Sequence, residues 1–125
     1  MNYDVKTKDN DAVMLLMDGA RALADKENRK FRETRDDESS SEETRNWHEY
    51  RYLKAKAMVA SLNYTFAKNR AVDAKIYTPD TPVGRADLAV YAADRDKAKA
   101  EYTFAVLVAE TAESAWRESY RHVKH

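Results

Sequence analysis

Residues 50–74 read YRYLKAKAMVASLNYTFAKNRAVDA, and within them small and aromatic residues return at alternating intervals of three and four. The residues on this spacing are Tyr50, Leu53, Ala57, Ala60, Tyr64, Ala67, Ala71 and Ala74. Such a spacing is the heptad repeat of a coiled coil, in which one stripe of an α-helix packs against a partner helix. The stretch therefore predicts a long helix whose contact stripe is mostly alanine and tyrosine.

A second stretch, nearer the C-terminus, repeats this spacing. Its stripe consists of Leu88, Tyr91, Arg95, Ala98, Tyr102, Ala105, Ala109, Ala112, Trp116, Ser119 and Val123. Residues 78–84 join the two stretches and read TPDTPVG, which favours a turn. We therefore expect the two helices to fold back around residue 81 and to pack antiparallel. Large side chains would then meet small ones, with Tyr102 over Ala60 and Tyr64 over Ala98.

A further helix is predicted before this hairpin, because residues 10–35 carry one apolar face, made of Val13, Leu16, Met17, Ala20, Leu23 and Ala24. The second helix is expected to start at a capping box, Ser39-x-x-Glu42 or Ser40-x-x-Glu43, and the third at Thr81 as N-cap. The sequence thus predicts an all-α fold with helices at 10–35, 41–76 and 82–122. A short N-terminal helix packs on a long, alanine-rich antiparallel hairpin, and residues 1–125 form one elongated three-helix bundle.

The amino-acid composition argues against several classes of function. The chain has 125 residues, 22 basic and 22 acidic side chains, and no cysteine. A net charge of zero gives no general attraction to nucleic acid or to membranes, and without cysteine there is no disulfide and no thiolate metal site. The longest apolar runs, residues 12–17 and 104–109, are too short to span a bilayer, and no signal peptide is recognisable. We expect a soluble, cytoplasmic protein.

Catalytic motifs are missing from the sequence, which has no Gly-rich phosphate loop, no nucleophile elbow and no metalloprotease helix motif. His122 and His125 lie one turn apart, but they stand at the end of a helix, where a cation complements the helix dipole. His48 is interpreted as an ordinary surface histidine. We therefore expect a protein that is not an enzyme and that holds no cofactor and no metal.

Apolar side chains exceed what three helices can bury. Met58, Phe66, Phe104 and Leu107 lie off the two contact stripes, and the short first helix cannot cover all of them. The leading hypothesis is accordingly an interaction protein that occupies a surface on another protein or on a second copy of itself. In kind, it resembles the small accessory proteins of phages and mobile elements, such as anti-defence inhibitors, assembly factors or minor virion components.

Two alternatives stay open. Between residues 46 and 77 there are six basic residues against two acidic ones, with aromatic residues among them, so this helix is a candidate for binding nucleic acid. In a coiled coil, however, lysines commonly flank the contact stripe, as Lys54 and Lys68 do here. The second alternative is a minor structural or assembly component, which would self-associate.

A partner is expected to contact the start of the second helix, at Trp47, Arg51, Tyr52 and Lys56. Aromatic residues and arginine dominate the binding energy of protein interfaces. In the antiparallel hairpin, Trp116 and Tyr120 would lie opposite this end and add further aromatic surface. Arg51, Tyr52 and Lys56 are expected to face outward. In the competing interpretation, Tyr52 packs under the first helix, and Arg51 and Lys56 are solvated charges.

Overall fold

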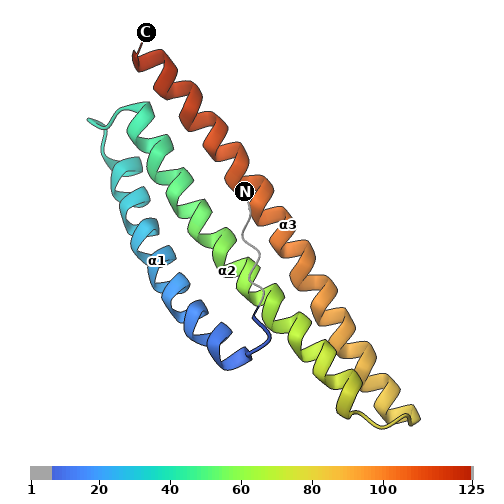
Figure 1. Cartoon of the computed structure of the whole chain (residues 1–125). Coiled ribbons are helices and arrows are strands. Elements are labelled where there is room, and N and C mark those ends of the chain that lie inside the picture. Colours follow the sequence, from blue (N-terminus) through green and yellow to red (C-terminus); the bar gives the residue numbers. More distant parts are fainter. Residues whose placement is uncertain (1–6, 125) are drawn as a thin grey trace.

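The computed structural model describes residues 7–124, and it consists of three helices joined by two short turns (Figure 1). They are α1 (Asn10–Asp36), α2 (Glu42–Tyr77) and α3 (Pro82–Lys124). Within the described residues there is no strand. The predicted all-α fold is confirmed, and each helix begins and ends within two residues of its expected bounds.

Local sequence explains where two of the helices begin, with one difference from the prediction. The Thr81 hydroxyl accepts a hydrogen bond from the Gly84 backbone N–H at 3.0 Å, as expected of an N-cap. The N-cap of α2 is Ser41, whose hydroxyl accepts from the Thr44 N–H, and not Ser39 or Ser40. Ser39 is engaged in the preceding turn instead, where its N–H and hydroxyl both donate to Asp37 and lower the pKa of that carboxyl.

The three helices form a single layer with α2 in the middle (Figure 1). α1 packs on one side of α2 and α3 on the other, and in the described part of the chain α1 and α3 do not pack against each other. The expected antiparallel hairpin of α2 and α3 is confirmed. Because the outer two helices lie on opposite sides of α2, the apolar residues of α3 gain no cover from α1.

Alanines bring α2 and α3 close together. Ala57 and Ala109 are completely buried at this interface, packed against Leu53, Tyr102, Ala105 and Val106. Tyr64 and Tyr102 belong to adjacent layers of the antiparallel hairpin. Their rings stack with centroids 6.1 Å apart. We call the stripe of α3 that faces α2 (Tyr91, Ala98, Tyr102, Ala105, Ala109, Ala112 and Trp116) the inner seam.

α1 is held on α2 by one stripe of its own. Val13, Met17 and Ala20 pack with Leu62, and Met58, Val59 and Phe66 complete this cluster. At the start of α1, the Asn69 side-chain amide donates to the Thr7 carbonyl and to Asn10 Oδ1, both at 3.0 Å. The expectation that Leu16 and Leu23 belong to the packed face of α1 is wrong. Both lie beside the stripe and are about half exposed, because α1 contacts a single helix.

Candidate partner-binding surfaces

The four residues predicted as a partner site form two separate pairs. The Arg51 guanidinium lies 5.6 Å from the centre of the Trp47 ring, and Lys56 Nζ lies 5.4 Å from that of Tyr52. Each pair is also connected to α1, because Arg51 pairs with Glu27 at 3.1 Å and Tyr52 stacks on Phe31 at 5.9 Å. Arg51 and Tyr52 therefore both contact α1, through residues that lie one turn apart on that helix.

Only part of the expected outward-facing set is exposed. Lys56 and Arg51 are both exposed, whereas Tyr52 packs against α1 and does not point away from it. The expectation of an outward-facing Tyr52 is wrong, because Phe31 in the last part of α1 offers its ring a stacking partner. Whether a partner binds at these residues stays a prediction.

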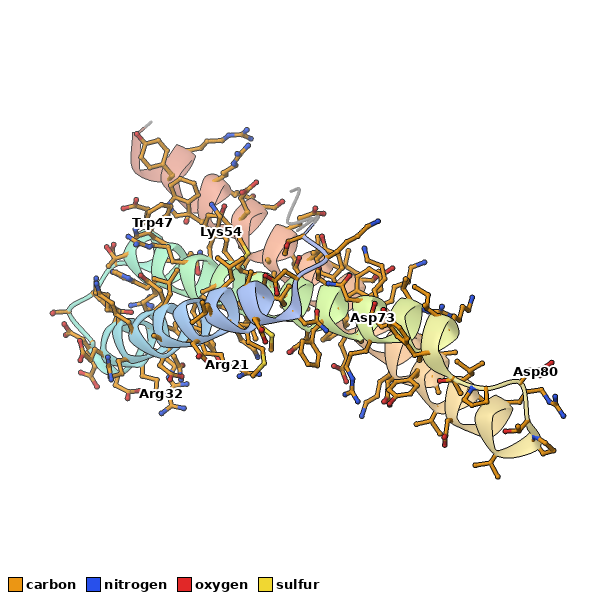
Figure 2. The ribbon with its side chains drawn as sticks, turned by 60° about the horizontal axis from the view of Figure 1, so that its bottom comes forward. Arg21, Arg32, Trp47, Lys54, Asp73 and Asp80 are labelled. Atoms are coloured by element: carbon orange, nitrogen blue, oxygen red, sulfur yellow. The ribbon has the colours of Figure 1, made fainter. Side chains whose placement is uncertain are left out.

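An aromatic cluster occupies the open end of the hairpin, as expected. Trp47 and Trp116 lie with their ring centroids 4.5 Å apart, and Trp116 is 6.0 Å from both Tyr50 and Tyr120. Figure 2 shows Trp47 on the same end of α2 as Lys54, remote from Asp73 and Asp80. The indole Nε1 of Trp116 is buried without a hydrogen-bond partner. This cluster fixes the open end of the hairpin and draws α3 towards the start of α2.

A groove between α1 and α2 contains the one buried carboxylate of α1. It is lined by Leu23, Glu27, Arg51, Lys54, Ala55 and Met58. The Glu27 residue is 2% exposed, and its Oε1 accepts a hydrogen bond from Arg51 while its Oε2 has no partner. Removing a charge from water costs free energy that only close pairing repays. Arg51 therefore has a structural role in holding α1 on α2.

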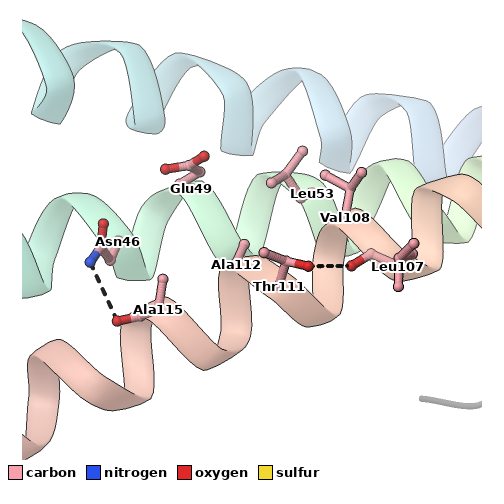
Figure 3. Close-up of a pocket in the computed structure, with 8 residues that line it drawn as sticks. All are labelled: Asn46, Glu49, Leu53, Leu107, Val108, Thr111, Ala112 and Ala115. Carbon is pink, nitrogen blue, oxygen red and sulfur yellow. Dashed lines mark hydrogen bonds between the residues drawn. The ribbon is translucent and has the colours of Figure 1, made fainter.

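A second groove lies between α2 and α3 and is mostly apolar (Figure 3). Its lining is Asn46, Glu49, Leu53, Leu107, Val108, Thr111, Ala112 and Ala115. At one end the Asn46 amide donates to the Ala115 carbonyl and to the Ser119 hydroxyl. Glu49 is its single titratable residue, so this groove offers neither an acid–base pair nor a metal-ligand set.

The outward face of α3 carries a second stripe, which is not among the two predicted contact stripes. Four large apolar side chains there are mostly exposed: Val83 (73%), Val90 (59%), Phe104 (68%) and Leu107 (61%). They belong to one 3-4 spacing, which we call the outer seam: Val83, Ala86, Val90, Ala93, Lys97, Ala100, Phe104, Leu107 and Thr111. The signal is present in the sequence, because Phe104 and Leu107 lie off the inner seam and keep the same 3-4 spacing as Val83 and Val90.

Histidines and acidic residues are the candidate metal ligands among the described residues. Among residues 7–124 there is no group of three His, Cys, Asp or Glu side chains placed to hold a metal ion. His48 is half-buried with its Nδ1 inaccessible and unpartnered, so its interpretation as an ordinary surface histidine is wrong. The side chains of His122 and His125 lie outside the described residues. No helix in the described part is long and apolar enough to cross a membrane.

Several cations of α2 lie over aromatic rings one turn earlier in the same helix. Lys54 lies over Tyr50, Lys68 over Tyr64, and Arg70 over Phe66, with distances of 5.8, 5.0 and 5.7 Å to the ring centroids. Tyr50 and Tyr64 are also stacked on rings of α3. The rings that would stack on bases in a nucleic-acid complex are thus engaged within the molecule.

Comparisons of the chain with protein-family models, with curated proteins and with solved structures gave no match.

Proposed function

We propose that this chain is a non-enzymatic interaction protein, either an inhibitor or an adaptor. Its binding surface is the outer seam of α3, which binds a helix of the partner. One observation carries the proposal: four large apolar side chains at heptad spacing are 59–73% exposed on a face that α1 and α2 leave uncovered. Contiguous apolar surface on a soluble protein marks an interaction site more often than scattered residues do.

The geometry of the outer seam suits a helical partner. Its spacing is that of a coiled-coil contact, and small residues such as Ala93 and Ala100 alternate with large ones, so a second helix can approach closely. The hollow beside Ala100, Phe104 and Leu107 is bordered by Asp96, Lys99 and Thr103, which gives the apolar centre a polar rim. An apolar centre with a polar rim is the usual composition of a protein interface.

The test compares the wild-type chain with the double variant Phe104→Glu/Leu107→Glu. Both side chains are exposed, so the substitutions should leave folding intact while placing charges in the seam. Each chain is tagged, captured from the source cells and analysed for bound protein, with its own untagged copies included. We expect complexes that the wild type retains to be lost from the variant.

The matched control is Leu15→Glu/Ile76→Glu, which alters two equally exposed apolar residues away from the outer seam. It should behave as the wild type does. If the seam variant keeps every complex, or if the chain forms none, the proposed function is wrong. Binding of the wild type to single-stranded nucleic acid, weakening steeply with salt, would instead favour the nucleic-acid alternative.

A further inference from the structure

Among the described residues, neither α1 nor α2 covers the outer seam of α3, because α1 lies on the far side of α2 and the seam faces away from α2. The exposed apolar residues of the seam run from Val83 to Leu107, or about 36 Å at 1.5 Å per residue of helix. This surface is therefore free to pair with a second chain.

We propose that two copies of this chain pair antiparallel through the part of the outer seam from Ala100 to Thr111, with Phe104 of each copy opposite Leu107 of the other. Val83 and Val90 lie outside this contact. This inference rests on the proposed function, because it names the partner of the same surface. Two-fold symmetry gives two Phe–Leu layers at the centre of the contact. On either side of them, Ala100 faces Thr111 of the second copy, so a small residue again meets a medium one.

Charges flanking the seam favour this register. In it, Asp96 stands opposite Arg117 of the second copy, and two-fold symmetry makes this attractive pair occur twice. Both side chains are more than half exposed in the single chain, where Asp96 contacts Arg95 and Arg117 contacts Glu113. The neighbouring flanking positions join Glu101 to Val108, Thr103 to Glu110 and Asp94 to Ala115, so no like charges meet there.

Other arrangements bring like charges together. If the antiparallel register is shifted by one heptad so that Phe104 faces Ala100, Glu101 meets its own symmetry mate and Asp96 meets Glu110. In a parallel dimer, Asp96 flanks Glu101 of the second copy, and the two Lys97 side chains share one layer of the core. Like charges at these positions destabilise a coiled coil, so charge complementarity selects the first arrangement.

Cysteine cross-linking tests the arrangement. Because the chain has no native cysteine, only the introduced cysteines can form a disulfide. Ala100→Cys and Thr111→Cys are purified separately, mixed and mildly oxidised. Because the proposed register sets these positions opposite each other, we expect the mixed disulfide to form faster than either symmetric one. Faster formation of the symmetric Ala100→Cys dimer would indicate parallel pairing and overturn the proposal.

A charge exchange provides a second, independent readout by sedimentation. Asp96→Arg should raise the dissociation constant of the dimer about tenfold, because it replaces two attractive pairs with repulsive ones. The double variant Asp96→Arg/Arg117→Glu restores opposite charges and should return the constant close to that of the wild type. A double variant weaker than the single one would contradict the proposed register.

The sedimentation of the wild type separates this inference from the proposed function. A chain that stays monomeric when purified, yet captures a different protein through Phe104 and Leu107, overturns the dimer and leaves the proposed function standing. A purified chain that is dimeric and remains so in Phe104→Glu/Leu107→Glu overturns the outer seam as the contact. The control Leu15→Glu/Ile76→Glu should dimerise as the wild type does.

Discussion

At the scale of single residues, the two glycines stand under opposite constraints. A Cβ atom at Gly84 would lie 2.0 Å from the Pro79 carbonyl oxygen, whereas nothing lies within 4 Å of the same point at Gly19. Gly84→Ala must shift the turn before α3 and should lower the free energy of unfolding by about 1–3 kcal/mol. Gly19→Ala, inside α1, should raise it by about 0.5–1 kcal/mol. Urea denaturation measures both, and equal effects would contradict the structure.

Arg51 was expected to face outward at a partner site, and its contact with Glu27 adds a role in stability. Arg51→Ala leaves a buried carboxylate unpaired, so the free energy of unfolding should fall by about 1–2 kcal/mol, less than for a fully buried pair because Arg51 is exposed. Lys56→Ala, at an exposed position, should leave it within about 0.5 kcal/mol of the wild type.

A double-mutant cycle separates the pairing of Arg51 with Glu27 from the loss of its packing on Trp47. Once Glu27→Met removes the carboxylate, Arg51→Ala should cost much less, since no unpaired charge remains. Thermal melts of the four proteins measure this coupling. If Arg51→Ala costs as much beside Met as beside Glu27, the ion pair does not hold α1 on α2.

At the scale of the helices, the alanines of the inner seam set the distance between α2 and α3. Ala57 and Ala109 are completely buried and face side chains of the other helix. Ala57→Leu or Ala109→Leu should therefore lower stability by about 1–3 kcal/mol through overpacking. Ala89→Leu, on an exposed part of α3, is the matched control and should change little. Unchanged melting of the Ala109→Leu variant would argue against close packing at this interface.

The packing of α2 on α3 could be predicted from sequence, but that of α1 could not be predicted in detail. Heptad spacing and the turn at 78–84 are local signals, so they specify both the seam and its antiparallel partner. The side of α2 that α1 contacts depends instead on distant pairs, such as Glu27 with Arg51 and Asn10 with Asn69. The spacing of residues within α1 does not indicate which residues of α2 it contacts.

The candidate surfaces, too, could be predicted from the sequence only where they depend on local signals. Trp116 could be placed opposite Trp47 because the fold-back fixes which residues of the hairpin meet. Tyr52 could not be placed, because its orientation depends on where Phe31 of α1 lies. The spacing of the outer seam can be recognised in the sequence. Its exposure cannot, because it depends on α1 packing on the far side of α2 in the folded molecule.

At the scale of the whole molecule, a single layer gives its three helices unequal protection. α2 is packed on both sides, whereas α1 and α3 each pack on α2 alone. A helix with one packed side opens at a lower free energy than the helix it packs on, because fewer apolar contacts must be broken. When α1 opens, the hairpin of α2 and α3 stays intact. We therefore expect α1 to unfold before the hairpin does.

Hydrogen exchange measured by mass spectrometry tests this order, at a protein concentration low enough to keep the chain monomeric. Amides near Ala57 and Leu62 in the centre of α2 should exchange most slowly, and those of α1 fastest among the three helices. Raising the concentration should slow exchange in α3 between residues 96 and 117 if the outer seam pairs, and should leave α1 unchanged. Equal protection of α1 and α2 in the monomer would mean that α1 does not open separately, and the layer would then unfold as one unit.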